Sequence, residues 1–279
     1  MACAISPTAL FARIGRAGAP LIIDTRLPSD YEKSDLLIPA SLRQTSSDFP
    51  SVNEHFPTDR EVVLYCVDGN EVSQDSAEKI CKSGFSAFYL EGGFEAWESG
   101  GYPTMRKLPE VGLPASLGKA TQWITRERPK IDRIACPWLI HRFIDPIPSF
   151  HYVPAAEVIS AGAARGALPY DVPGVRFTHR GQDGELCSFD ALVADLGLTD
   201  HSVHAVATIV RGADTGKPEL TPQSPGLMAI SLGLSHNFRD DHEMLAHGMV
   251  MYDALYAWAR SVRDEPHNAD LFKLPPQPK

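Results

Sequence analysis

The sequence has few cysteines, no long hydrophobic run and no excess of positive charge, and each shortage argues against a class of protein. Its five cysteines are scattered and contain no C-x-x-C pair, which predicts reduced thiols in a cytoplasm rather than a disulfide framework. No 18 uncharged apolar residues occur together, and the first residues lack a basic region ahead of an apolar run. We therefore expect neither a membrane span nor export. Acidic side chains outnumber basic ones by 35 to 26, so bulk nucleic-acid binding is not expected.

What the sequence does contain is enough apolar material for two domains. It has 279 residues, of which 43% are hydrophobic and 22% are charged, as is typical of a soluble protein with two domains. Residues 107–116 contain two prolines and a glycine without a regular period, which indicates a linker at 108–118. We therefore expect domains at 1–107 and 119–263, and a poorly ordered tail at 264–279 that is rich in proline and polar residues.

The first domain carries the pattern of an α/β fold with a parallel sheet and flanking helices. Short apolar runs at 20–24, 61–65 and 87–90 are bounded by turn residues, which predicts strands covered on both faces. Between the last two runs, residues 73–83 have helical spacing and end at Gly84. This order predicts a strand, loop, helix and strand unit.

Cys66 follows the strand at 61–65, where a glycine-containing loop leads into the helix. A helix start directs free N–H groups and a positive dipole at such a point, so it favours a thiolate and can cradle an anion. Cys66 is therefore a candidate nucleophile. The alternative is a small buried hydrophobe at a strand end, which is common for free cysteine. Cys81 lies on the apolar stripe of the helix, so we expect it to be structural.

Several short motifs in this domain resemble the rhodanese family of sulfurtransferases. They are Asp24-Thr-Arg26, Cys66-x-x-Gly69, Glu91-Gly-Gly-Phe-Glu-Ala-Trp97 and Gly101-Tyr-Pro103, and together they cover about residues 8–105. The resemblance implies that Cys66 carries sulfane sulfur as a persulfide between a donor and a thiophilic acceptor, without a cofactor. It also implies an anion-binding loop whose backbone N–H groups come from Val67, Asp68, Gly69, Asn70, Glu71, Val72 and Ser73.

The loop departs from the family pattern in ways that predict a different donor. Val72 stands where the family usually has an arginine before the serine, and the loop is one residue longer than in typical sulfurtransferases. Related phosphatases depend on that arginine, so phosphatase chemistry is not expected. Asp68 and Glu71 should oppose thiolate formation and repel small oxyanions, unless they are only solvated loop acids. We expect weak activity on thiosulfate and better activity on a larger thiol-bound substrate.

The second domain resembles the C-terminal domain of the chromate-resistance (ChrB-type) protein family. The motifs are Arg126-x-Arg-Pro-Lys-Ile-Asp-Arg-Ile-Ala-Cys-Pro-Trp-Leu-Ile140, Cys187-Ser-Phe-Asp190, Ile209-Val-Arg-Gly-Ala-Asp214, Gly226-Leu-Met-Ala-Ile-Ser-Leu-Gly-Leu234 and Tyr252-Asp-Ala-Leu-Tyr256. The resemblance implies a part in tolerating chromate or its thiol complexes. Helical signals at 188–196, 201–211, 225–234 and 241–263 predict a mainly α domain with a few short strands.

A basic segment at the start of this domain is a candidate oxyanion patch. Its cations are Arg126, Arg128, Lys130 and Arg133. Arginines offer forked donors and helix starts offer N–H groups, although interleaved acids would also make a self-paired surface. Cys136-Pro137 permits two structures: a thiol activated at a helix cap, or a helix capped by Asp132 with Cys136 facing the core beside a kink at Pro137.

Metal binding by the second domain is a further hypothesis. The candidate ligands are His179, Cys187, His242 and Glu243, and Asp132 and Asp214 are further candidates. His242 and His247 are five residues apart, whereas a zincin-type helix needs four, and Asp240 with Glu243 is also a helix-capping pair. A turn at 181–184 could bring His179 and Cys187 together across a hairpin. The alternatives are satisfied histidines and a buried thiol.

The two resemblances predict a cytoplasmic sulfurtransferase that moves sulfane sulfur through Cys66 and serves chromate resistance or the detoxification of chromium–thiol species. The alternatives are a non-catalytic oxyanion, metal or redox sensor, and a metal-dependent activity in the second domain. The expected partners are a small-molecule sulfur donor and a thiol acceptor, including glutathione-linked ones, and chromate or a chromium–thiol complex. Nucleic acid and membranes are not expected partners.

Overall fold

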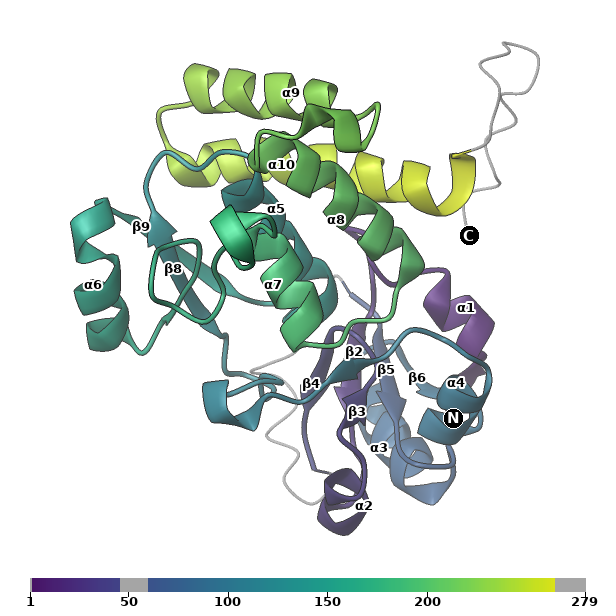
Figure 1. The fold of residues 1–279 in the computed structure, drawn as a ribbon. Coiled ribbons are helices and arrows are strands. Elements are labelled where there is room, and N and C mark those ends of the chain that lie inside the picture. Colours follow the sequence, from purple (N-terminus) through teal and green to yellow (C-terminus); the bar gives the residue numbers. More distant parts are fainter. Residues whose placement is uncertain (1, 46–59, 264–279) are drawn as a thin grey trace.

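The first domain is built on a parallel sheet of five strands with helices on both faces (Figure 1). The computed structural model describes residues 2–45 and 60–263. The strands, in spatial order, are β1 (Cys3–Ile5), β6 (Ala87–Leu90), β5 (Val62–Tyr65), β2 (Leu21–Asp24) and β4 (Ser41–Arg43). The helices are α1 (Pro7–Phe11), α2 (Pro28–Glu32), α3 (Glu71–Lys82) and α4 (Gly93–Ser99). The predicted α/β architecture is confirmed.

The apolar runs that predicted strands supply both faces of this sheet. On β5, Val63 and Tyr65 belong to one core cluster with α1, α4 and the second domain, whereas Val62 and Leu64 belong to a second cluster with α3. All four residues of β5 are fully buried, as the two-residue period of a strand between two layers requires. A small antiparallel ribbon of β3 (Leu36–Leu37) and β7 (Met105–Arg106) lies apart from the sheet.

The second domain surrounds a parallel sheet of three strands with helices, and the predicted mainly α fold is confirmed. The strands, in spatial order, are β10 (Leu168–Pro169), β8 (Gln122–Arg126) and β9 (Ser149–Val153). The helices are α5 (Asp132–Leu139), α6 (Val158–Arg165), α7 (Ser188–Asp195), α8 (His201–Asp214), α9 (Ser224–Asn237) and α10 (Asp241–Ala257). Helix α10 continues as a π-helical turn at Trp258–Val262. None of the helices within 2–45 and 60–263 is long and apolar enough to cross a bilayer.

The two domains pack against each other along a continuous apolar interior. Figure 1 shows the C-terminal end of α10 beside α1, and Arg260 there donates to the carbonyl of Ile14 at 2.9 Å. The segment predicted as a linker is itself packed, because Leu108, Leu113 and Leu117 are buried. The predicted flexible tail at 264–279 lies outside the described residues.

Candidate functional site

Cys66 lies directly after β5, beneath the first turn of α3. Its side chain is 3% exposed, and its Sγ is 3.2 Å from Ser73 Oγ and 3.5 Å from Asp68 Oδ1. The Ser73 hydroxyl is also 3.3 Å from the carbonyl oxygen of Asn70. The thiol therefore faces one hydroxyl and one carboxylate, and its outer side faces a surface hollow.

The backbone of α4 holds the loop that carries Cys66. Phe94 N–H donates to Cys66 O and Glu95 N–H donates to Val67 O, both at 2.9 Å. Gly69 has φ +74°, and a Cβ there would lie 2.5 Å from Leu90 O. The Cys66 loop therefore touches the segment at 90–93 backbone to backbone. This close approach explains why Gly69 and Gly93 are both glycine.

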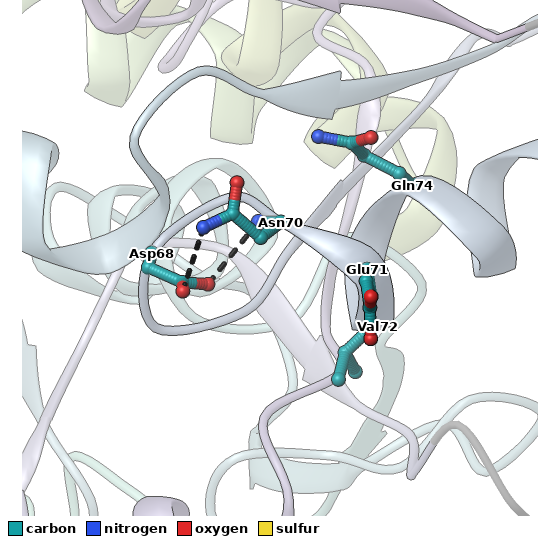
Figure 2. Close-up of a pocket in the computed structure, with 5 residues that line it drawn as sticks. All are labelled: Asp68, Asn70, Glu71, Val72 and Gln74. Atoms are coloured by element: carbon teal, nitrogen blue, oxygen red, sulfur yellow. Dashed lines mark hydrogen bonds between the residues drawn. The ribbon is translucent and has the colours of Figure 1, made fainter.

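Part of the predicted anion-binding loop is occupied by its own side chains. Asn70 donates to the Asp68 carboxylate from its backbone N–H at 3.1 Å and from its amide at 2.8 Å (Figure 2). These bonds, the side-chain one first, hold the pKa of Asp68 below its ordinary value. Ser73 N–H donates to Asn70 O. The prediction that every N–H group from 67 to 73 faces the anion is therefore wrong for Asn70 and Ser73.

Two adjoining hollows form the mouth of the site, and both have acidic walls. The hollow at the thiol has a volume of about 280 Å³ and is lined by Leu27, Asp30, Cys66, Val67, Asp68 and Val72. Its neighbour has about 510 Å³ and is lined by Asp68, Asn70, Glu71, Val72 and Gln74 (Figure 2). Among the described residues that line the two hollows there is no lysine or arginine, so none of them replaces the missing arginine as an anion clamp.

The arginine of the Asp24-Thr-Arg26 motif binds a carboxylate within the first domain and does not line the hollow at Cys66. Arg26 is 1% exposed and binds Asp24 through two nitrogens, at 2.6 Å for the shorter contact. Tyr65 donates its hydroxyl to the same carboxylate at 3.0 Å. The guanidinium also lies 4.7 Å from the ring centroid of Phe94, so it joins the sheet to α4 and stays buried.

A second polar centre lies in the other domain, around His179. Its Nε2 is 3.0 Å from Asp214 Oδ2, 3.4 Å from Asp132 Oδ2 and 3.5 Å from Asp171 Oδ1. Contacts with Asp132 and then Asp214 raise the pKa of His179 to about 10. Burial raises the pKa values of Asp132 and Asp171.

Other side chains orient these carboxylates. Ser188 donates its backbone N–H to Asp132 at 3.1 Å and its hydroxyl to Asp171 at 2.8 Å. Arg126 and Arg133 contact Asp171 Oδ2 at 2.8 and 3.0 Å. The centre therefore combines residues from α5, α7, α8 and the loops around 171 and 179.

Both halves of the chain match known families. Residues 6–100 match the family described as Rhodanese-like domain, and residues 123–259 match the family described as ChrB, C-terminal domain. The chain joins a rhodanese-like domain to a ChrB C-terminal domain. The five-stranded parallel sheet and the mainly helical second domain agree with these matches.

The named relatives resemble one part of the chain at a time. "Protein ChrB" of Cupriavidus metallidurans is 32% identical over 143 residues, which are 51% of this chain and 42% of that protein. The chain thus spans less than half the length of that curated relative. A thiosulfate sulfurtransferase from Pseudomonas aeruginosa is 28% identical with a TM-score of 0.33, over 37% of this chain and 19% of that one. A rhodanese-related protein from Thermoplasma volcanium is 22% identical with a TM-score of 0.32, over 37% and 96% respectively.

The predicted oxyanion patch of the ChrB C-terminal domain is divided by its hydrogen bonds. Arg126 and Arg133 converge on Asp171. The guanidinium of Arg128 instead donates to carbonyl groups at the end of α9, including Phe238 O at 2.6 Å. Lys130 is exposed. A shared patch is therefore wrong for Arg128, because its donors already satisfy the free carbonyl groups of a helix end.

Cys136 faces the core, as the second of its two predicted structures requires. It is fully buried in α5 beside Pro137. Burial, followed by the charge of Asp132, raises the pKa of its thiol well above the ordinary value. The activated-thiol alternative is therefore wrong. The prediction that Asp132 caps this helix is wrong: α5 begins at Asp132, and that carboxylate faces His179.

Of the four predicted metal ligands, only His179 lies in a group of converging ligand atoms among the described residues. A backbone bridge between Arg180 and Leu186 forms the predicted hairpin, but Cys187 turns inward and contacts Asp190 at 3.4 Å. His242 packs against the ring of Tyr152. Glu243 N–H donates to Asp240 at 2.8 Å as part of a helix cap, so the grouping of His242 and Glu243 with His179 is wrong.

Sequence reasoning missed Asp171, which touches His179, Arg126 and Arg133. Its position carried a weak signal. It follows β10 by two residues, and β10 is parallel to β8, so Asp171 and Arg126 meet at the carboxyl edge of one sheet. Because β10 has only two residues, the sequence contains no apolar run that would predict this strand.

Proposed function

We propose that the chain is a sulfurtransferase that carries sulfane sulfur on Cys66 and serves chromate resistance. The observation that supports the chemistry is the position of Cys66 at the carboxyl end of a central strand, beside an open hollow of about 280 Å³. The twelve-residue helix α3 begins at Glu71 and directs its N-terminal dipole toward the thiol. The match to the ChrB C-terminal domain supports the link to chromate.

The reaction consists of two displacements at one sulfur atom. The Cys66 thiolate attacks the outer sulfur of a donor persulfide, and the donor S–S bond breaks with its electron pair leaving on the donor thiolate. A new S–S bond joins that sulfur to Cys66. An acceptor thiolate or cyanide then attacks the outer sulfur, and the electron pair of the broken bond restores the Cys66 thiolate.

The acidic mouth favours a persulfide on a larger thiol, such as glutathione, over thiosulfate. Asp68 lies 3.5 Å from the thiol and its pKa is lowered, so it is ionised at neutral pH. Two like charges about 4 Å apart repel by about 1 kcal/mol even in water, and by more near a protein surface. Thiosulfate carries two negative charges, whereas a persulfide on a larger thiol keeps its other charged groups farther from Asp68.

The central test is thiocyanate formation from cyanide with glutathione persulfide as the donor. Wild type should form thiocyanate, and mass spectrometry after donor treatment should find one added sulfur atom on Cys66. Cys66→Ser should abolish both signals. Cys81→Ser is the matched control, because Cys81 lies on α3 and donates to Ala87 O. Equal turnover in Cys66→Ser, or no turnover with any sulfane donor, would refute the proposal.

The donor preference has its own test in Asp68→Asn. The amide keeps an acceptor for Asn70 N–H but removes the charge beside the thiol. We expect kcat/KM for thiosulfate to rise roughly fivefold, from about 1 kcal/mol of relieved repulsion, with a smaller change for glutathione persulfide. Asp75→Asn, an exposed acid on the same helix, should leave both values unchanged. Equal gains with both donors would contradict the charge argument.

A non-catalytic sensor is the second candidate function. The observation in its favour is that the Cys66 thiol is only 3% exposed, and that the described residues lining its hollow include no cationic side chain. In that case Cys66 would accept sulfur once and hold it. Single-turnover persulfidation without subsequent release to cyanide or thiols would support the sensor, whereas repeated turnover would support the enzyme.

A further inference from the structure

A second site lies apart from Cys66, where four ligand-type side chains meet in the ChrB C-terminal domain. They come from separate parts of the chain: Asp132 from the start of α5, Asp171 from the loop after β10, His179 from the hairpin and Asp214 from the end of α8. One ligand atom each from Asp132, Asp171 and His179 lies within 4.8 Å of the other two. We propose that Asp132, Asp171 and His179 bind one divalent first-row transition-metal ion, and that Asp214, which contacts His179 but lies outside this group of mutually close ligand atoms, completes the ligand set when the ion is bound.

The spacing of the atoms fits a metal better than it fits a hydrogen-bond network. His179 Nε2 lies 3.0, 3.4 and 3.5 Å from oxygen atoms of three different carboxylates, yet this nitrogen carries at most one hydrogen. Ligand atoms about 2.1 Å from a metal are roughly 3.0 Å apart in an octahedron and 3.4 Å apart in a tetrahedron. The three contacts therefore have the separations of neighbouring ligands around one ion.

The surrounding contacts orient the carboxylates and use only part of the lone-pair capacity of the oxygen atoms that face His179. Arg126 and Arg133 contact Asp171 through Oδ2, whereas its Oδ1 faces His179. Ser188 donates its N–H to Asp132 Oδ2 and its hydroxyl to Asp171 Oδ1, the same oxygen atoms that face His179, and so fixes their relative orientation. A carboxylate oxygen that accepts one hydrogen bond keeps a second lone pair for a metal. Carboxylate ligands of metals are commonly held by such outer hydrogen bonds.

An independent observation comes from Cys136. It follows Asp132 by four residues, so both side chains lie on the same face of α5. The thiol is fully buried and makes no hydrogen bond with any described residue. Burial, and then the charges of Asp132, Asp171 and Asp214, raise its pKa. An unpartnered polar group thus borders the same centre. His179 is 35% exposed and Asp214 is 13% exposed, which gives an ion a path from solvent.

The ligand set selects the class of metal. Three carboxylates and one imidazole suit Mn²⁺, Fe²⁺ or Zn²⁺, whereas Cu⁺ prefers sulfur ligands and Mg²⁺ prefers oxygen and retains several waters. Ligand competition from the thiols elsewhere in the chain is smallest for Mn²⁺, because it binds sulfur weakly. Mn²⁺ is therefore the probe that best distinguishes this site from thiol sites, and Zn²⁺ is the second probe.

The test measures metal binding to the full chain directly. Protein stripped with a chelator and dialysed against Mn²⁺ or Zn²⁺ should retain one equivalent by elemental analysis, and its melting temperature should rise with metal concentration. His179→Gln and Asp214→Asn should each weaken binding at least tenfold and remove the thermal shift. Both residues are partly exposed, so these variants should fold.

Controls separate this site from general affinity for metals. Asp195→Asn removes a carboxylate that is paired with Arg180, and His247→Gln removes an exposed imidazole on α10. Both should bind metal as wild type does, and so should Cys66→Ser. Failure of wild type to retain either ion would overturn the proposal. Unchanged affinity in folded His179→Gln and Asp214→Asn would overturn it as well.

Discussion

At the scale of single residues, the hydrogen bond between Ser73 and Cys66 reverses its direction with the protonation state of the sulfur. When the sulfur carries a proton, Ser73 can donate to Asn70 O at 3.3 Å and accept from the thiol at 3.2 Å. When the sulfur is a thiolate, the hydroxyl must rotate and donate to sulfur. Ser73 therefore supplies a side-chain donor to the thiolate in a site where none of the described lining residues is an arginine or a lysine.

Ser73→Ala tests this role. Loss of a hydrogen bond to a charged group costs about 1.5 kcal/mol, so kcat/KM with glutathione persulfide should fall roughly tenfold. Ser76→Ala is the matched control, because Ser76 is buried on the same helix but donates to Val72 O at 2.7 Å. An equal loss in both variants would show that helix packing, and not the sulfur contact, accounts for the effect.

Sequence reasoning found the individual residues of the rhodanese-like site more readily than their partners. Cys66 was predicted from a strand followed by a loop and a helix, which are local features. The inward turn of Asp68 toward the thiol and toward Asn70 depends on side-chain rotamers, which no local pattern specifies. Asp171 was missed for a related reason: its contacts with Arg126 and Arg133 join residues about 40 positions apart.

At the scale of elements, the Cys66 loop and the start of α4 are held together by two glycines. A Cβ on Gly69 would lie 2.5 Å from Leu90 O and 2.7 Å from Gly93 N, and one on Gly93 would lie 2.5 Å from Gly69 N. Both glycines have positive φ. The loop geometry that presents the thiol therefore depends on a close backbone approach that only glycine permits.

Gly69→Ala should separate this approach from the conformational preference of glycine. Gly84 also has positive φ, but a Cβ there would meet nothing within 4 Å. Gly84→Ala should cost only the left-handed conformation, about 1–2 kcal/mol, and retain sulfur transfer. Gly69→Ala should cost more and lower kcat/KM at least tenfold. Urea unfolding and thiocyanate assays measure the two effects, and equal results for the variants would contradict the clash.

A pair of arginines joins the hairpin of the ChrB C-terminal domain to α7 through Asp195. Hydrogen bonds from Arg180 and then Arg176 lower the pKa of Asp195. A carboxylate whose pKa is lower in the folded state stabilises the protein above its unfolded pKa of about 3.9. That contribution is lost as the pH falls through the pKa of Asp195 in the folded protein. The stability that Asp195 gains from Arg180 and Arg176 is therefore present at pH 7 and disappears in acid.

Asp195→Asn should therefore destabilise the protein in a pH-dependent manner. We expect a loss of about 1 kcal/mol at pH 7, discounted because both arginines are about a third exposed. The difference from wild type should shrink below about pH 4. Urea unfolding at several pH values measures it. Asp183→Asn changes the net charge equally at an exposed turn and should show no such trend, and a constant difference for Asp195→Asn would contradict the linkage.

The strands and helices followed the sequence closely, since their signals are local. The run at 61–65 became β5, and the capping pair of Asp240 and Glu243 begins α10 as its spacing indicated. Helix α3 starts two residues before the predicted Ser73, because the first turn includes Glu71 and Val72. Helix starts are poorly determined by apolar spacing, since the first residues need not face the core.

At the scale of the whole molecule, the two domains share one interior. A single cluster of buried side chains includes Tyr65 and Trp97 of the first domain with Trp138 and Tyr256 of the second. At Gly15 an added Cβ would lie 2.6 Å from the Tyr256 ring. The sequence predicted a linker between separate domains, because complementary surfaces such as these come from residues distant in the chain and leave no local pattern.

A shared interior predicts that both domains unfold together, and Tyr252→Phe tests this from one side. Tyr252 is fully buried, and its hydroxyl donates to Ile131 O at 3.0 Å within the second domain. Removing this bond should cost about 1 kcal/mol. Where exchange requires global opening, amide hydrogen exchange should then accelerate roughly fivefold in β5 as well as in α10. Acceleration in α10 with unchanged exchange in β5 would show that the rhodanese-like domain is stable on its own, and that the strand carrying Cys66 does not depend on its neighbour.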